Sequence, residues 1–105
     1  MEPTGKMRRL LERMAQIERM ERGTLCRMTG RPHYNHQTWR NGRNEVRYIP
    51  ANEAVALQEA IEGYRSFMQL AEQYVDEVVR LTRREQEKKK RMQTTQSRNT
   101  GLKQN

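Results

Sequence analysis

The sequence predicts a mainly α-helical protein with one small β-hairpin, arranged as an antiparallel, coiled-coil-like helix pair with a two-stranded ribbon between the helices. Three observations support this fold class: two segments in which apolar residues recur every three or four positions, and an Asn-Gly pair between them. Such periodicity marks one face of an amphipathic helix, and Asn-Gly is the strongest short signal for a hairpin turn. A single domain is expected over residues 1–93, followed by a disordered polar tail over residues 94–105.

The first helix is expected over about residues 5–22. Thr4 is a suitable N-cap and Gly23 is well placed to end the helix. Apolar residues at steps of three and four fall on one face: Met7, Leu10, Leu11, Met14, Ile17 and Met20. We interpret this stripe as a packing surface, since methionine usually fills cores.

The hairpin is expected to have strands over about residues 34–40 and 43–49, because aromatic and β-branched residues flank the turn at Asn41-Gly42. A two-residue turn places Arg40 opposite Arg43, and alternation then divides the side chains between two faces. One face is expected to pack on a helix, with Trp39 as a core residue beside Val46 and Tyr48. The other face is expected to be a basic patch made of His36, Arg40, Arg43 and Arg47.

The second helix is expected over about residues 53–90, with Asn52 as its cap and Glu53 in the first turn. Its apolar residues alternate steps of four and three, which is typical of a coiled-coil seam: Leu57, Ile61, Tyr64, Met68, Ala71, Val75 and Val78. Gly63 interrupts this helix and is expected to cost roughly 1 kcal/mol relative to alanine.

The two predicted helices differ in length, roughly 27 Å against roughly 57 Å at 1.5 Å per residue. The first helix therefore covers only about half of the second. An apolar stripe near the end of the second helix is left without an intramolecular partner: Tyr74, Val75, Val78, Val79 and Leu81. Since such a stripe is unfavourable in water, we expect a homodimer or a helical protein partner; the alternative is that the first helix is longer or shifted and covers more of the stripe.

Charge indicates the class of partner. The formal net charge is +8, and residues 27–48 carry five positive charges and one negative charge. Residues 83–105 carry eight positive and two negative charges. We therefore expect nucleic acid, either DNA or RNA, to be bound by His36 and the hairpin arginines together with a basic segment near the C-terminus: Lys88, Lys89, Lys90 and Arg91.

Three further readings stay open. A coiled-coil adaptor without a role on nucleic acid would use the stripe that begins at Tyr74 instead. A membrane surface is less favoured, because the basic segment lacks a bulky apolar face. Within nucleic-acid binding, Tyr34 and Trp39 are the candidate aromatics for base stacking, although Trp39 is expected in the core.

Nothing in the sequence indicates an enzyme. There is no Gly-rich phosphate loop, no Ser-His-Asp arrangement and no carboxylate pair in an apolar setting, so no small-molecule substrate is expected. Cys26, His33 and His36 are too few for a structural zinc site, and no metal or cofactor is expected. One cysteine and no long apolar run favour a reducing, cytoplasmic location and exclude a transmembrane helix.

Several short motifs resemble a family of short bacterial proteins of unknown function that are often encoded within or beside transposable elements. The motifs are Glu21-Arg22-Gly23-Thr24-Leu25, Asn41-Gly42-Arg43, Arg47-Tyr48-Ile49-Pro50 and Ile61-Glu62-Gly63-Tyr64-Arg65-Ser66-Phe67. The resemblance spans roughly residues 7–82 and implies a mobile-element context. Members typically carry a cysteine cluster before the hairpin, whereas this chain has only Cys26 there. Any metal site of the family is therefore expected to be absent.

Overall fold

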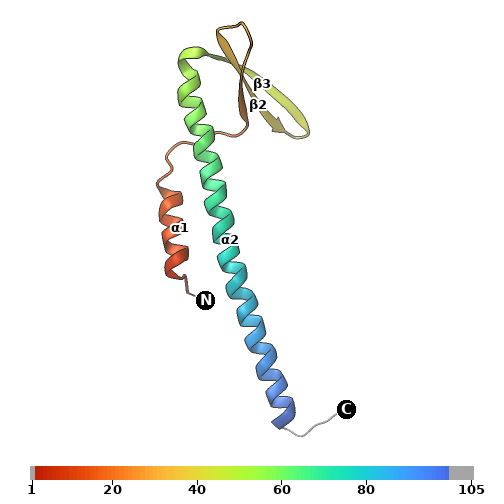
Figure 1. Cartoon of the computed structure of the whole chain (residues 1–105). Helices are drawn as coiled ribbons and strands as arrows, with labels where there is room; N and C mark the ends of the chain where they lie inside the picture. The colour runs from red at the N-terminus through yellow and green to blue at the C-terminus, as the bar shows by residue number, and fades with distance from the viewer. Residues whose placement is uncertain (1, 100–105) are drawn as a thin grey trace.

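The chain folds into a short helix, a small antiparallel sheet and one very long helix. The computed structural model describes residues 2–99, with side chains described up to residue 93. Its elements, in chain order, are α1 (Gly5–Ala15), β1 (Thr24–Arg27), β2 (His33–Arg40), β3 (Arg43–Pro50) and α2 (Ala51–Asn99). Figure 1 shows the sheet at one end of α2 and α1 alongside the middle of α2. The molecule is elongated, measuring 80 × 31 × 19 Å.

The sheet has three strands in the order β1-β2-β3, so the predicted two-stranded ribbon was wrong by one strand. β1 pairs only with the first half of β2, from Arg27 opposite Tyr34 to Thr24 opposite Gln37. Its four residues are too few to display an alternating pattern, which is why the sequence did not indicate it. The distal half of the β2–β3 hairpin, residues 38–45, consequently projects as a two-stranded ribbon.

The turn and register of this hairpin are confirmed. Arg40 pairs with Arg43 and Trp39 with Asn44. Asn41 and Gly42 have φ values of 52° and 75°. Two consecutive positive φ angles are typical of a type I′ turn, whose twist matches that of the flanking strands. The strands are one residue longer than expected, because His33 pairs with Pro50.

The first helix is shorter than expected: α1 ends at Ala15 rather than near residue 22. Its start is set by a capping box in which the backbone N–H of Met7 donates to the Thr4 hydroxyl at 3.1 Å. Residues 17–22 leave the helix and run along α2, where the backbone N–H of Glu21 donates to the carbonyl oxygen of Ala60 at 3.0 Å. Ile17 lies in this extended segment and is half-buried there. Its apolar side chain therefore fitted the helical spacing in the sequence although the helix had already ended.

Gly63 permits this close approach. A Cβ atom at position 63 would collide with the carbonyl oxygen of Arg19 and lie 3.3 Å from Cγ2 of Ile17. The glycine that weakens the helix locally is thus required by the packing of the extended segment. Because α1 has only 11 residues, the expected coiled-coil-like helix pair is not what the structure shows.

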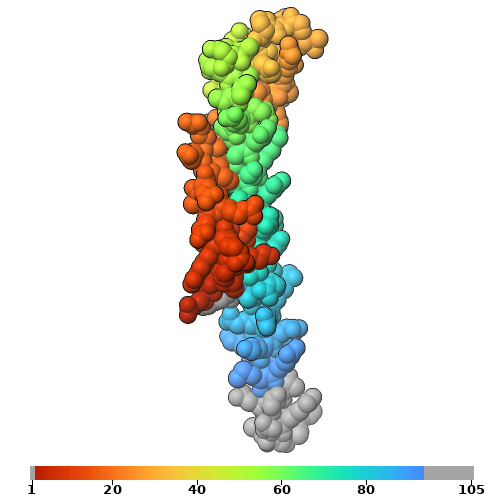
Figure 2. Space-filling model, turned by 60° about the vertical axis from the view of Figure 1, so that its left-hand side comes forward, coloured from red at the N-terminus to blue at the C-terminus, as the bar shows by residue number. Residues whose placement is uncertain are grey.

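The long helix α2 follows β3 directly, beginning at Ala51 after Pro50. Asn52 therefore lies inside the first turn rather than capping it, while Glu53 is in that turn as expected. The helix continues to Asn99 instead of ending near residue 90, and the remainder of the predicted disordered tail, residues 100–105, lies outside the described residues. In Figure 2 the blue part of α2 extends beyond α1.

The core is thin. Apolar side chains that are at least nine-tenths buried come from α1, the end of β3 and α2: Met7, Leu10, Ile49, Ala54, Ile61 and Leu70. At about 1.5–3 kcal/mol for each large side chain, these few residues provide limited hydrophobic stabilisation. Within the described part of the chain, neither helix has a stretch apolar enough to cross a bilayer.

Candidate functional site

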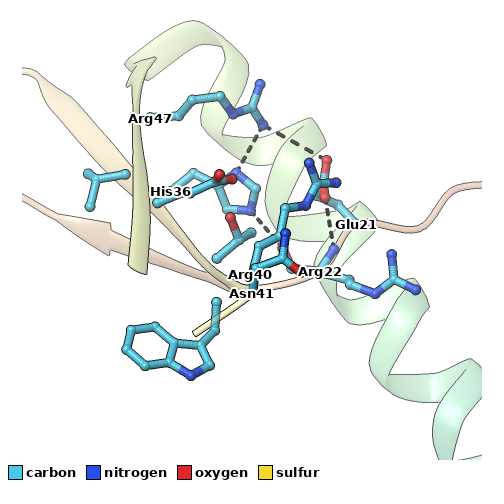
Figure 3. Close-up of a pocket in the computed structure, with 10 residues that line it drawn as sticks. Glu21, Arg22, His36, Arg40, Asn41 and Arg47 are labelled. Atoms are coloured by element: carbon cyan, nitrogen blue, oxygen red, sulfur yellow. Dashed lines mark hydrogen bonds and ion pairs between the residues drawn. The ribbon is translucent and has the colours of Figure 1, made fainter. Parts of the chain in front are cut away.

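A hollow of about 490 Å³ lies between the hairpin and the segment that connects α1 to the sheet. Figure 3 shows Arg40 and Arg47 of the hairpin reaching over it toward Glu21 and Arg22. Three arginines and two glutamates contribute to its wall, which consists of Glu21, Arg22, His36, Thr38, Trp39, Arg40, Asn41, Glu45, Val46 and Arg47. The predicted basic patch is therefore partly neutralised where it faces the body of the protein.

Gly23 follows directly after Arg22, which lines this hollow. Its φ of 94° lies in the region that disfavours side chains, and a Cβ there would collide with the carbonyl oxygen of Gln37. This close approach lets the chain leave the surface of α2 and enter β1, and it holds the backbone of Arg22 against β2. The Arg22 guanidinium also lies 5.4 Å from the centre of the Tyr64 ring, a cation–π distance that ties the turn to α2.

His36 lies at the centre of the hydrogen-bond network and is only 3% exposed. Its Nε2 is 2.6 Å from the carbonyl oxygen of Arg22, and Nη2 of Arg47 is 2.9 Å from its Nδ1. A carbonyl only accepts and a guanidinium only donates, so this geometry requires a neutral ring with its proton on Nε2. The expectation that His36 contacts a phosphate is corrected, since burial leaves no free ring nitrogen.

Arg47 is also engaged within the protein. Besides its bond to His36, its Nη2 lies 3.9 Å from Oε1 of Glu21, although the side chain is 62% exposed. The three bonded groups link β3, β2 and the extended segment in one chain of contacts. Arg47 therefore lies beside the other hairpin arginines as predicted. A ligand would have to compete with His36 and Glu21 for its guanidinium.

Arg40 and Arg43 differ from Arg47. They are directly opposite each other next to the turn, and both are exposed. Within the described residues neither takes part in an ion pair, a hydrogen bond or a ring contact. Like charges directly opposite on two strands destabilise the pair. The tip of the hairpin thus holds two positive charges that form no ion pair within the described residues.

The expected burial of the two sheet faces was wrong, except that Arg40, Arg43 and Arg47 are exposed as predicted. His36 and Ile49, on the face predicted to be basic and solvated, are 3% and 4% exposed because that face packs toward α2. The face predicted to enter the core points outward, and Trp39 is 73% exposed. The prediction placed the face with aromatic and β-branched residues in the core. The face that packs toward α2 instead buries His36, which is hydrogen-bonded to Arg22 and Arg47. We call the outward side the outer face; its strand residues are Thr24, Cys26, His33, Asn35, Gln37, Trp39, Asn44, Val46, Tyr48 and Pro50.

The basic segment Lys88–Arg91 lies on the exposed part of α2, where Arg91 is 3.8 Å from Glu87. Figure 1 places it toward the end of α2 opposite the sheet. The rise of a helix puts residue 90 about 60 Å from residue 51. The two groups of residues predicted to contact nucleic acid are therefore well separated and do not form one continuous surface.

The apolar stripe predicted to hold a partner is partly covered. Tyr74, Val78 and Leu81 are half-buried, whereas Val75 and Val79 are 48% and 37% exposed. An extended residue covers about twice the length of a helical one. Residues 17–22 therefore carry α1 farther along α2 than a continuous helix would reach, and Thr4 meets Glu77.

The residues that sequence reasoning missed are Glu21, Arg22 and Tyr64, which join the sheet to the helices. A signal for them existed in Gly23 and Gly63, which mark the two close backbone contacts. Among the described residues no cluster of three potential metal ligands is present. Cys26 and His33 lie on the outer face and His36 on the inner one, so these three do not converge.

Comparison with known proteins gave no match: no family model, no curated protein and no solved structure is similar to this chain.

Proposed function

We propose that this protein is a small accessory nucleic-acid-binding protein that contacts phosphates through the tip of its hairpin. The main support is the pair Arg40 and Arg43. Their exposed guanidinium groups belong to opposite residues of the hairpin, and neither forms an ion pair within the described residues. A phosphate between them would remove the repulsion that the pair otherwise carries.

The basic segment of α2 has a different part in this proposal. Its charges supply sequence-independent attraction to the backbone of DNA or RNA, while the hairpin sets the position. The separation of the two regions means that both are occupied only on a long nucleic acid. A mobile-element context for this activity is proposed from the short sequence motifs alone, because no family model matches the chain.

The first test is fluorescence anisotropy of labelled duplex DNA, single-stranded DNA and structured RNA, titrated with the full chain over a salt series. Binding through phosphates weakens steeply with salt. The double variant Arg40→Ala/Arg43→Ala should lower affinity and reduce the salt slope by about 1.8 for duplex DNA, since each lost contact contributes about 0.9.

A matched control is Arg8→Ala/Arg9→Ala on α1, because both pairs are exposed and both variants lose two positive charges. The proposal requires the hairpin variant to bind more weakly than this control. Equal losses would mean that affinity depends on net charge alone, and an absence of binding at moderate salt would refute the function.

A second candidate is an adaptor that binds another helix. Met68, Val75 and Val79 are exposed on α2 at spacings of seven and four residues, which puts them on one face. A partner helix laid on that face would bury them and make a complex that resists high salt. Sedimentation of the protein alone tests the simplest form, a homodimer that Val75→Asp should dissociate.

A further inference from the structure

The outer face of the sheet exposes an unusual set of side chains. Trp39, Val46 and Tyr48 are 73%, 54% and 62% exposed, and Trp39 is the only tryptophan of the chain. Their neighbours on the face are polar but uncharged, among them the amides of Asn35, Gln37 and Asn44. Aspartate, glutamate, lysine and arginine are absent from the strand positions of this face in the described sheet.

The rings are held at fixed positions by the register. Trp39 shares a cross-strand pair with Asn44, and Tyr48 shares one with Asn35. These pairs are four residues apart along the strands, or about 13 Å. His33 stacks on Tyr48 with ring centres 4.3 Å apart and planes inclined by 30°, which restrains the tyrosine. The face therefore presents two separated aromatic surfaces with the Gln37 amide and Val46 between them.

The surroundings of the face are strongly positive. Residues 24–50 contain five arginines and one glutamate. Arg40 and Arg43 directly adjoin Trp39 and Asn44 in sequence, and they project from the ribbon on its opposite side. A ligand with flat, uncharged rings and a negatively charged chain matches this arrangement, since its rings meet the aromatics and its chain reaches the arginines by passing over the turn at Asn41-Gly42.

We propose that the outer face binds single-stranded nucleic acid by stacking unpaired bases on Trp39 and Tyr48. This inference rests on the proposed function and names its substrate class. Bases in a duplex are stacked on one another and present only their edges in the grooves, so duplex does not offer the ring faces that this surface fits. The Gln37 amide between the rings donates to and accepts from the free edges of the bases.

Trp39 itself reports on the interaction, because it is the only tryptophan. Intrinsic fluorescence is measured while the full chain is titrated with oligo(U), oligo(dT) and a mixed-sequence duplex of the same length. Stacking should quench the emission with the single strands and leave it nearly unchanged with the duplex. Anisotropy of labelled strands gives the affinity for variants that lack the indole.

Two classes of variant separate stacking from charge. Trp39→Leu and Tyr48→Leu should each weaken single-strand binding by about 5- to 150-fold and leave the salt slope unchanged, since a base stack involves no counter-ion. Arg40→Ala/Arg43→Ala should instead reduce the slope by about 1.4 on single strands. Trp39→Phe should restore most of the affinity, because it keeps a stacking ring.

The outcomes distinguish this inference from the function on which it rests. If the arginine variant loses binding but the leucine variants do not, the protein binds nucleic acid and the stacking inference is wrong. If Trp39→Leu weakens duplex and single-strand binding alike, or if a dimer forms that Trp39→Leu dissociates, the inference is also overturned. If the protein binds none of the nucleic acids, both the proposed function and the stacking inference are wrong. Since Trp39 and Tyr48 are exposed, circular dichroism should show unchanged folding in every variant.

Discussion

The carbonyl oxygen of Arg19 occupies the space in which a side chain at Gly63 would lie. This contact brings two backbones together and, with the hydrogen bond from Glu21 to Ala60 nearby, holds the extended segment on α2. The position of the sheet depends on it, because the chain enters β1 immediately after this segment.

Gly63→Ala should therefore destabilise the protein, although alanine is the better helix former by about 1 kcal/mol. The added methyl group meets rigid backbone, so the segment has to move and loses its bond to Ala60. We expect a net loss of about 1–3 kcal/mol, as for other overpacked sites, measured by urea unfolding. The matched control is Gly5→Ala, where the nearest atom is the flexible end of Arg9 at 3.2 Å. That variant should be neutral or stabilised, and equal effects at both positions would contradict the argument.

Thr4 and Glu77 connect the start of α1 to α2. The Thr4 hydroxyl donates to Oε2 of Glu77 at 3.0 Å and accepts from the backbone N–H of Met7. Thr4→Ala removes both interactions and should cost at least the roughly 1 kcal/mol of a lost cap. Thr4→Ser keeps the hydroxyl and should retain most of the stability. Thermal unfolding of the two variants checks this, and an equal loss in both would exclude a role for the hydroxyl.

Glu77 also makes stability depend on pH. Its pKa is held below the ordinary value, chiefly by the two hydrogen bonds from Arg80 and next by the bond from Thr4. A lowered folded-state pKa means that the contribution is complete above the unfolded value of about 4.3 and is lost as pH falls through the folded pKa. Glu77→Gln should therefore flatten the acid side of a plot of melting temperature against pH. Glu72→Gln, at an exposed position of the same helix, should leave the acid side unchanged.

The sequence predicted those parts of the fold that depend on local chemistry. The Asn41-Gly42 turn, the hairpin register and the cap at Thr4 each follow from a few adjacent residues, and the structure has all three. The end of α1 and the orientation of the sheet depend on contacts between distant segments. Ile17 satisfies a helical period as well as it satisfies the extended packing, and His36 reads as polar until Arg22 and Arg47 are found beside it.

In the candidate site, too, some features follow from local sequence and others depend on contacts between distant segments. Arg40 and Arg43 could be placed together from the turn alone, because their pairing is fixed by two intervening residues. The exposure of Trp39 could not be predicted, since a tryptophan beside β-branched residues ordinarily belongs to a core. Only the position of α2 against the other side of the sheet decides which face is covered.

His36 provides a direct check on the network beneath the hairpin. Nitrogen-detected NMR at neutral pH should show a neutral ring with its proton on Nε2, because Arg22 accepts there and Arg47 donates to Nδ1. His36→Ala should cost at least about 1–3 kcal/mol by leaving the Arg22 carbonyl without its donor. His33→Ala removes only a half-buried ring that stacks on Tyr48, and should cost less. A proton on Nδ1, or equal losses at the two histidines, would show that the network does not fix the ring.

The repulsion at the hairpin tip leads to a prediction in which stability and binding change in opposite directions. Arg43→Glu converts the like-charged pair with Arg40 into an opposite-charged one, which should raise the free energy of unfolding by about 0.2–1 kcal/mol. The same change removes a phosphate contact and adds a repulsive charge, so affinity for nucleic acid should fall. Arg8→Glu, on exposed α1, makes the same change in net charge and should affect binding less. Chemical unfolding and anisotropy on the same samples test both parts. A residue retained for stability alone would show the reverse, with Arg43→Glu unfolding more readily and binding unchanged.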